Sequence, residues 1–362
     1  MTARLSLAMI VKDEEESLDR VLGQAAAFCD ELVVADTGST DRSREIAVAA
    51  GARVVDVPWT DDFAAARNAS FAPCTGDWIL WLDADDSVPE EVQQRFRQAK
   101  DDLLTDELDA VWTPYRYHFS PETGQCTLVV PRERMVRRAA GLQWTGRVHE
   151  VLTVPLDRSV ARDDLYVEHR PHPAKNERKT GRNLRILQSA VASGDRSPRT
   201  LYYFANELWD NGRPEEALVA YEDFLASPGD GWERYAALVS MSRCASGLGR
   251  WEQAREYGLR AIALDPSRAE AFLAVGDLYF AREDWVGGAP FFAAATVARM
   301  PSIGFISDAD YSWRPSDQLS ICLANSGRHE QAVQEAMRSL RDGNPERERV
   351  RSNIKWCIDQ LG

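Results

Sequence analysis

The sequence has no long apolar run that could cross a membrane. No stretch approaches 18 consecutive apolar residues. One short apolar run, residues 5–11, lies near the start and is followed at once by five charged residues. A run this short is too little for a signal peptide. We therefore expect a soluble, cytoplasmic protein without an integral membrane segment.

Cysteine spacing and net charge exclude further classes of protein. The six cysteines show no CxxC spacing, which argues against a zinc ribbon or a redox pair and fits free thiols in a reducing compartment. Lysines and arginines number 43 against 57 aspartates and glutamates, which gives a net charge of −14. Because a surface this acidic repels phosphate backbones, we expect no nucleic-acid partner.

The first half of the chain alternates short apolar runs with helical patterns. Such alternation is typical of βαβ units, which build a parallel sheet. Ser39 or Thr40 is expected to cap the second helix. The expected strands are 5–11, 31–35, 52–57 and 78–82, and the expected helices are 15–28, 40–50, 61–71 and 89–104.

Between residues 111 and 167 the pattern changes to a series of β-type runs. Turn residues at 121–124 separate the first two runs and predict a hairpin. We expect these runs to extend the first domain as a mixed sheet. The runs are 111–119, 127–136, 151–154 and 165–167.

The second half contains a helical repeat. The strings NGRPEEA, LGRWEQA, REDWVGGA and SGRHEQA each place a turn before an alanine. The spacings of these alanines, 37, 35 and 43 residues, lie near the period of about 34 residues of tetratricopeptide repeats. A generic stack of helical hairpins is the alternative, and either arrangement presents a concave surface that binds partners. The alanines are Ala217, Ala254, Ala289 and Ala332.

These patterns divide the chain into two domains, the number that 362 residues favour. We expect an α/β domain at 1–174, a linking helix at 175–198 and an all-α helical solenoid at 199–362. Because helical repeats also assemble into dimers, self-association as a homodimer is left open.

Acidic side chains follow the ends of the expected strands. The carboxyl ends of parallel strands lie along one edge of a sheet, and ligands of open α/β sheets bind there. Asp36 follows the second strand, and Asp83 and Asp85 follow the fourth. Two aspartates at i and i+2 offer hard oxygen ligands to Mg²⁺ or Mn²⁺. Alone the pair is weak evidence, because Asp86 could simply cap the following helix.

Four strings occur in order at these strand ends: LSLAMIVKDEEESL, DELVVADTGSTDRS, DDFAAARNAS and GDWILWLDADD. In this order they strongly resemble family 2 glycosyltransferases of the GT-A fold, over roughly residues 4–185. The string DTGSTD lacks the G-x-G-x-x-G spacing, so a Rossmann dinucleotide site is not supported. The expected fold class is an α/β GT-A domain followed by an all-α, tetratricopeptide-like solenoid.

The resemblance implies a nucleotide-sugar site at the sheet edge. Val11 and Glu14 would border the base, and Asp36 would accept hydrogen bonds from the base or ribose. Arg67 would lie near the nucleotide or its diphosphate. Uracil is the usual base of such sites, so the implied donor is a UDP-sugar that carries a hexose or an N-acetylhexosamine.

The resemblance also implies a metal site. In the motif Asp83-Ala84-Asp85, Asp83 would contact ribose or sugar and Asp85 would bind Mn²⁺ or Mg²⁺. The string VEHRPHPAKNERKTGRNLRIL resembles the His…Lys…Arg-Asn ending of the subfamily that carries helical repeats. The family histidine precedes Gly-Tyr, whereas His169 precedes Arg-Pro-His. We take His169 as the metal ligand, with His172 as the alternative.

A basic stretch surrounds these histidines. Residues 132–185 hold 13 basic and 7 acidic side chains in an otherwise acidic protein. Such a stretch suits a diphosphate site, because arginine forks bind phosphate. For most of these side chains, however, a solvated basic face is the expected arrangement.

The mechanism we infer is inverting transfer. A base deprotonates the acceptor, which attacks the anomeric carbon from the face opposite the leaving UDP, and the base must lie within hydrogen-bond reach of that proton. Glu150, in a Gly-x-x-His-Glu element that resembles the repeat-carrying subfamily, is the first candidate, and Asp86 is the second. The alternative for Glu150 is an ion pair with Arg147 or Arg138.

The helical repeats bear on the acceptor. Tetratricopeptide solenoids usually hold peptides or proteins, so we expect a peptide or protein acceptor. The combination resembles bacterial transferases that modify ribosomal peptides, including the S-glycosyltransferases of glycosylated bacteriocins. A lipid-linked or polysaccharide acceptor is the alternative within the enzyme hypothesis, and a non-catalytic interaction scaffold is the alternative outside it.

Overall fold

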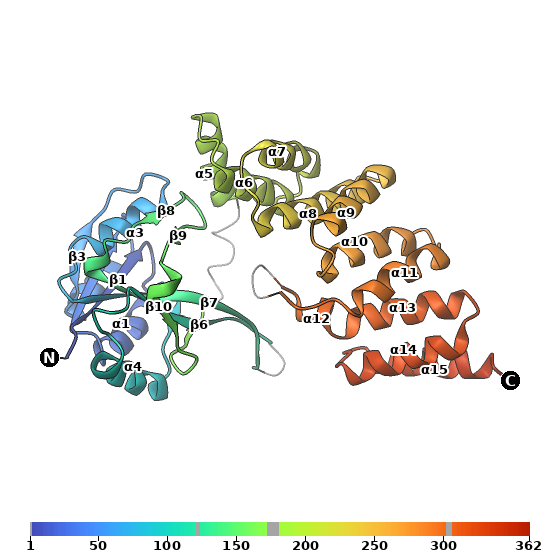
Figure 1. Ribbon diagram of the computed structural model, residues 1–362. Coiled ribbons are helices and arrows are strands. Elements are labelled where there is room, and N and C mark those ends of the chain that lie inside the picture. The colour runs from blue at the N-terminus through green and yellow to red at the C-terminus, as the bar shows by residue number, and fades with distance from the viewer. Residues whose placement is uncertain (1, 121–123, 172–180, 302–305) are drawn as a thin grey trace. The chain divides into compact units, whose positions relative to one another are not determined.

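The computed structural model describes residues 2–120, 124–171, 181–301 and 306–362. The chain divides into two compact units, Met1–Ala190 and Val191–Gly362. Figure 1 shows that the first unit carries the β-strands and that the second is built from helices. None of the described helices combines the length and the hydrophobicity needed to cross a bilayer.

Nine strands of the first unit form one mixed sheet within the described residues. They are β1 (Leu5–Val11), β2 (Glu31–Asp36), β3 (Arg53–Asp56), β4 (Trp78–Trp81), β5 (Asp86–Ser87), β6 (Ala110–Phe119), β7 (Cys126–Arg137), β10 (Ser159–Ala161) and β11 (Val167–His169). Their order is β3-β2-β1-β4-β7-β6-β11-β5, with β10 beside β6. The first four strands pair in parallel, and β7 runs antiparallel to β4.

The parallel part places the ends of β1, β2 and β4 at one edge, as predicted. In the register of β1 and β2, Val11 lies opposite Asp36. The N–H of Leu82, just after β4, donates to the carbonyl of Ala8 in β1. Polar residues that follow these strands therefore share the carboxyl edge, where ligands of open α/β sheets bind.

Helices cover this sheet, and one predicted helix cap is wrong. The described helices of this unit are α1 (Leu18–Ala26), α2 (Ser43–Ala49), α3 (Phe63–Phe71) and α4 (Glu90–Asp102), and α5 (Arg182–Ala192) crosses its boundary at Ala190. Neither Ser39 nor Thr40 caps α2, because their hydroxyls donate to the carboxylates of Asp36 and Asp13 instead. Residues 175–180 of the predicted linking helix lie outside the described residues.

Alternating side chains of β1 pack into cores on opposite faces of the sheet. Leu7 and Met9 pack in one core with Phe96 of α4. Ala8 packs in the other core with Phe71 of α3. The sheet thus lies between α1 and α4 on one face and α3 on the other, which holds the carboxyl ends of its strands in fixed positions.

The later strands complete the sheet and add a small second one. β6 and β7 form the predicted hairpin, although turn residues 121–123 lie outside the described residues. β8 (Trp144–Thr145) pairs with β9 (Val151–Leu152) in a separate two-stranded sheet. β5 was not expected, and Asp86 does not cap α4, because it pairs with His169 of β11 and α4 begins after Pro89.

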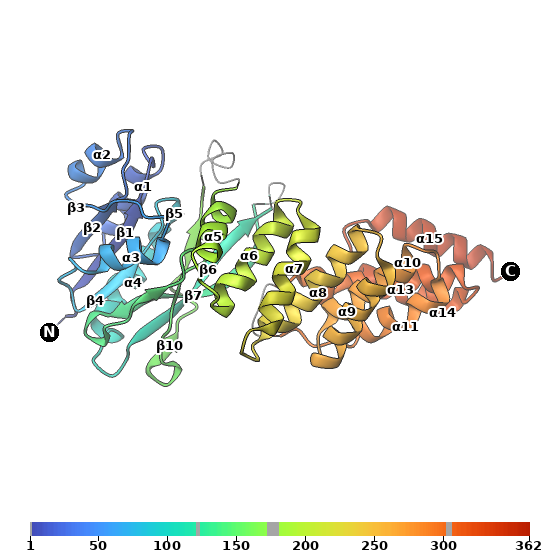
Figure 2. The same cartoon turned by 90° about the horizontal axis from the view of Figure 1, so that it is seen from above.

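The second unit consists of successive helix pairs. Its described helices are α6 (Pro198–Asp210), α7 (Pro214–Ala226), α8 (Trp232–Gly247), α9 (Trp251–Leu264), α10 (Ala269–Phe280), α11 (Trp285–Ala295), α12 (Asp308–Tyr311), α13 (Trp313–Asn325), α14 (His329–Arg341) and α15 (Arg347–Asp359). Figure 2 shows them following one another along the unit. The packed pairs are α6 with α7, α8 with α9, α10 with α11, and α13 with α14.

The predicted repeat is confirmed by the equivalent positions of its alanines. All four lie in the first turns of the second helix of a pair and are buried: Ala217, Ala254, Ala289 and Ala332. The preceding turn needs positive φ, which Gly212, Gly249 and Gly327 supply and which Glu283 adopts in the third pair. The long spacing of 43 residues accommodates the short helix α12.

Candidate active site

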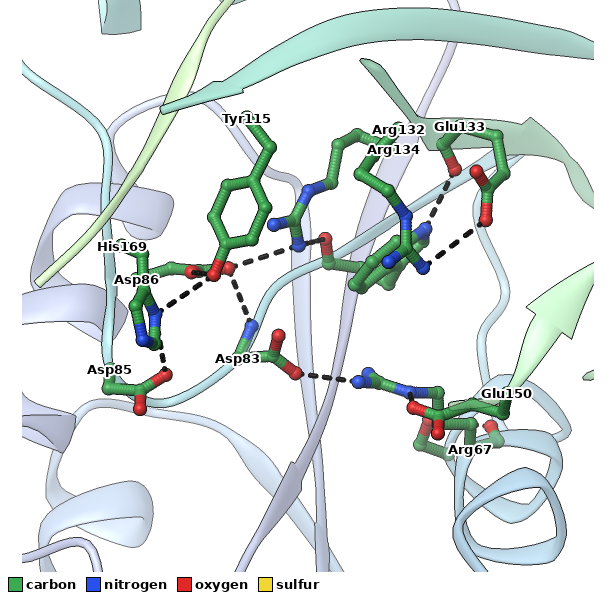
Figure 3. Close-up of polar contacts among 12 residues, drawn as sticks. Arg67, Asp83, Asp85, Asp86, Tyr115, Arg132, Glu133, Arg134, Glu150 and His169 are labelled. Atoms are coloured by element: carbon green, nitrogen blue, oxygen red, sulfur yellow. Dashed lines mark hydrogen bonds and ion pairs between the residues drawn. The ribbon is translucent and has the colours of Figure 1, made fainter. Parts of the chain in front are cut away.

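Asp83 comes two residues after β4 and forms an ion pair with Arg67 of α3. Asp83 Oδ1 lies 2.7 Å from Arg67 Nη2. Figure 3 marks this ion pair with a dashed line. Burial opposes ionisation of Asp83, but the charges of Arg67 and Arg134 outweigh it and hold the pKa of this carboxyl well below its usual range. Asp83 is therefore a fixed anion at the carboxyl edge of the sheet.

The Arg67 guanidinium joins several parts of the site. It lies 4.8 Å and 4.9 Å from the ring centroids of Trp81 and Trp144. Its Nε donates to Glu150 Oε1 at 2.5 Å. Burial lowers the pKa of Arg67, but its two carboxylate partners raise it above the ordinary value. The arginine thus stays charged and holds both carboxylates at the site.

Glu150 has a different partner from the two that we considered. Its carboxylate binds Arg67, whereas Arg138 donates to the carbonyl of Gly76. Glu150 thus forms an ion pair, but its partner is Arg67 and not Arg147 or Arg138 as that alternative expected. The physical reason is packing, because α3 lies against β8 and brings Arg67 beneath the turn that carries Glu150.

Asp86 lies fully buried beneath the loop that follows β4. Its Oδ2 pairs with Arg134 of β7 at 3.0 Å and accepts the backbone N–H of Asp83 at 2.9 Å. Its Oδ1 accepts the hydroxyl of Tyr115 at 2.7 Å. Burial raises the pKa of Asp86 to about 7, while the charge of Arg134 opposes that rise. Both oxygens of this carboxylate are thus engaged inside the protein.

Strand pairing brings Asp85 and His169 together. His169 of β11 lies opposite Asp86 of β5, and the N–H of Arg170 donates to the Asp85 carbonyl at 2.8 Å. The Nδ1 atom of His169 is 3.5 Å from Asp85 Oδ1, and the ring of Tyr117 stacks on the imidazole at 4.8 Å. His169, 84 residues from Asp85 in sequence, is therefore its direct neighbour.

This group has the donor atoms of a cation site. One ligand atom each from Asp85, Asp86 and His169 lies within 4.8 Å of the others. Because Asp86 is taken up by Arg134 and Tyr115, Asp85 and His169 are the two of these residues that fit a metal. His172, the alternative ligand, lies outside the described residues.

The residues predicted to hold the nucleotide lie along the same edge. Asp36 is buried at the end of β2, where it accepts hydrogen bonds from Ser39 and lies 3.7 Å from Arg44. Val11 is buried at the end of β1, and Glu14 begins the turn that leads into α1. Their contacts with a nucleotide stay a prediction.

Sequence reasoning missed two residues of this site. Tyr115 of β6 and Arg134 of β7 lie in no recognisable motif, and Arg134 was counted within a stretch expected to be largely solvated. For Arg134 that expectation is wrong, because the side chain is fully buried against the rings of Trp81 and Tyr115. Strand alternation gives a weak signal, since Arg134 shares its parity with the buried Val136.

Two solved structures are similar to parts of this chain. Glucosyl-3-phosphoglycerate synthase from Mycobacterium tuberculosis, in complex with Mn²⁺, uridine diphosphate and phosphoglyceric acid, is 22% identical with a TM-score of 0.37, and the match covers 53% of this chain and 79% of that one. YrrB, a tetratricopeptide protein with a peptide-binding site, is 15% identical with a TM-score of 0.39, covering 48% and 83%.

Sequence comparisons relate parts of the chain to known proteins. The model of glycosyl transferase family 2 matches residues 6–128. The glycosyltransferase SunS of Bacillus subtilis is 26% identical over 60% of this chain and 52% of its own length. A tetratricopeptide repeat-containing protein of Synechococcus elongatus is 45% identical over 31% of this chain and 30% of its own length. The match thus spans about half or less of these two relatives. The chain carries a segment that matches glycosyl transferase family 2 within a mixed-sheet unit, followed by a tetratricopeptide-like helical repeat.

Proposed function

We propose that this protein is a metal-dependent glycosyltransferase that moves a sugar from a UDP-sugar to an acceptor with inversion. The observation that carries the proposal is the pairing of β5 with β11, which sets His169 beside Asp85 at the carboxyl edge of the sheet. A second carboxylate, Asp83, lies at the same edge and forms an ion pair with the buried Arg67. Family membership of the domain supports the same reaction.

The donor set of this edge fits a divalent cation held by Asp85 and His169. Mg²⁺ takes oxygen ligands and keeps several waters, so the imidazole nitrogen of His169 favours Mn²⁺ over Mg²⁺. When bound, such a cation neutralises the charge that develops on a departing diphosphate. The positive charge of such a cation would also offset the negative charges of Asp83 and Asp85 where the UDP-sugar binds.

The remaining edge residues would bind and orient the donor. Asp83, immobilised by Arg67, would accept hydrogen bonds from ribose or sugar hydroxyls, and Ala84 would offer its backbone between the two aspartates. Asp36, with Val11 and Glu14, would border the uridine. Rigid placement lowers the activation barrier, because the entropy of orienting the donor is already lost when the donor binds.

We propose Glu150 as the base that takes the acceptor proton. Its side chain is 11% exposed and is held by Arg67 next to the Asp83 pair. For Asp86, the second candidate, we propose a positioning role in place of the role of base. A base must reach the acceptor proton, and the Asp86 carboxylate is fully buried with both oxygens engaged.

The helical repeat would hold the acceptor, for which we propose a peptide or protein side chain. Stacked helix pairs present an extended concave surface, which suits an extended chain better than a single sugar. The test compares the full chain with a chain that lacks residues 200–362 in transfer to an acceptor. We expect the shorter chain, shown folded by circular dichroism, to retain slow donor hydrolysis but to lose transfer. Unchanged transfer would contradict the role of the repeat.

The proposed activity is tested by incubating the full chain with a panel of UDP-sugars, Mn²⁺ and candidate peptides, and reading products by mass spectrometry. We expect a mass increase of one hexose or N-acetylhexosamine on a peptide. The Asp85→Ala variant should give none, whereas Asp157→Ala, an exposed aspartate of the 3-10 turn at Leu156–Arg158, should match the unaltered protein. If neither the unaltered protein nor Asp157→Ala hydrolyses a UDP-sugar or transfers its sugar, the result would favour the non-catalytic scaffold alternative.

A further inference from the structure

A continuous chain of polar contacts runs from a buried arginine to the histidine of the candidate metal site. Arg134 of β7 pairs with Asp86 of β5 at 3.0 Å. Asp86 accepts the hydroxyl of Tyr115 from β6 at 2.7 Å, and the same hydroxyl lies 2.9 Å from Nδ1 of His169 in β11. Figure 3 shows these side chains in a row, so each orients the next.

The single proton of the Tyr115 hydroxyl sets the direction of these hydrogen bonds. With the ordinary tyrosine pKa of about 10, the phenol is protonated near neutral pH. An ionised carboxylate only accepts hydrogen bonds, and Asp86 is paired with the arginine at 3.0 Å. The Tyr115 proton therefore points to Asp86, and the phenol oxygen can only accept from His169.

A neutral histidine that donates from Nδ1 carries its lone pair on Nε2. Asp85 Oδ1, at 3.5 Å from Nδ1, also favours a proton on that nitrogen. We propose that Tyr115 is a positioning residue that fixes His169 as the Nδ1–H tautomer, so that Nε2 is its metal-binding atom. The metal part of this inference rests on the proposed function, while the tautomer is a property of the metal-free protein.

The neighbouring Tyr117 provides a matched control on the same strand. Its ring stacks on the His169 imidazole with an interplanar angle of 3°, and its side chain is 47% exposed. Tyr115→Phe and Tyr117→Phe each remove one hydroxyl and keep the ring. Only the first change breaks the contact chain between Asp86 and His169.

The first test reads the tautomer by NMR of the ¹⁵N-labelled full chain without metal. The spectrum is recorded at pH 8.5, above the ordinary pKa of histidine, so that neutral imidazole dominates. His169→Ala identifies the signals. We expect a proton on Nδ1 and none on Nε2. A spectrum with the proton on Nε2 overturns the proposal. The tautomer is read in the unaltered protein, so the result does not depend on the folding of Tyr115→Phe.

The second test measures Mn²⁺ binding by calorimetry. Loss of a residue that hydrogen-bonds a metal-bound histidine typically weakens metal affinity by about 10- to 100-fold. We therefore expect Tyr115→Phe to weaken Mn²⁺ binding by that factor and to populate both tautomers. Tyr117→Phe should change neither. Equal affinity and an unchanged tautomer in folded Tyr115→Phe contradict the proposal. If the unaltered protein binds no Mn²⁺, the metal of the proposed function is wrong, and the tautomer still decides the role of Tyr115.

Discussion

The guanidinium of Arg67 and the carboxylate of Asp83 form a 2.7 Å ion pair that ties α3 to the loop after β4. The same guanidinium holds Glu150, which comes from the turn between β8 and β9. One buried arginine therefore connects three segments that are distant in sequence. Asp83, the first aspartate of the Asp83-Ala84-Asp85 segment, is thus anchored by this arginine.

Loss of Arg67 should destabilise the protein strongly. Arg67→Ala leaves Asp83 and Glu150 without their shared partner, and removing one member of a buried pair costs about 3–5 kcal/mol of unfolding free energy. Urea denaturation measures the change. Arg44→Ala, which breaks an exposed pair with Asp56, should leave the midpoint nearly unchanged. Equal effects of the two substitutions would contradict the buried role of Arg67.

Replacement of Glu150 should slow transfer without preventing donor binding. Glu150→Gln retains an oxygen that accepts from Arg67 but cannot take a proton, so kcat should fall by about 10²- to 10⁴-fold. Initial rates of transfer and calorimetry with UDP separate the two effects. Glu168→Gln, which alters a carboxylate paired with Arg170, is the control. Transfer at the normal rate by Glu150→Gln would place the base elsewhere.

Cysteine alkylation should distinguish buried thiols from Cys126, one of the two partly exposed cysteines. Burial raises the pKa of Cys74, Cys244 and Cys322 to about 12, so almost no thiolate forms at pH 8 and these groups react slowly. Cys126, half-buried at the start of β7, should be modified first. Mass spectrometry after brief iodoacetamide treatment reads the order, and rapid native labelling of Cys244 would contradict the packing of α8.

A glycine in the repeat should resist replacement by alanine. A Cβ on Gly276 of α10 would lie 2.7 Å from the buried ring of Phe292, so Gly276→Ala should cost about 1–3 kcal/mol of stability despite its better helix propensity. Gly247→Ala, where nothing lies within 4 Å, should instead gain up to about 1 kcal/mol. Thermal unfolding compares them, and a stabilised Gly276→Ala would contradict the close approach of α10 and α11.

Local patterns predicted the framework of this protein well. The apolar run 5–11 coincides with β1, because its side chains meet cores on both sheet faces. Ala254 and its equivalents identified the second helix of each repeat pair, because a small residue is needed where the two helices pack closely. Both features depend on neighbours a few residues away or on a regular period.

Long-range contacts were beyond the reach of such patterns. The pairing of Glu150 with Arg67 spans 83 residues, and nothing near Glu150 distinguishes that partner from Arg147. β5 has only two residues and exists because β11 pairs with it. The sequence around Arg134 does not show that the arginine is buried. Its environment forms only in the folded sheet, where β5 supplies Asp86 and β6 supplies the ring of Tyr115.

The most direct test of the proposed site is calorimetric titration of the full chain with UDP, once with Mn²⁺ and once with a chelator. If Asp85 and His169 hold the cation that binds the diphosphate, UDP affinity should fall at least tenfold in chelator, a difference of about 1.4 kcal/mol. Asp85→Ala should bind UDP equally weakly in both. Equal affinity of the unaltered protein with Mn²⁺ and with chelator would contradict the metal-dependent site.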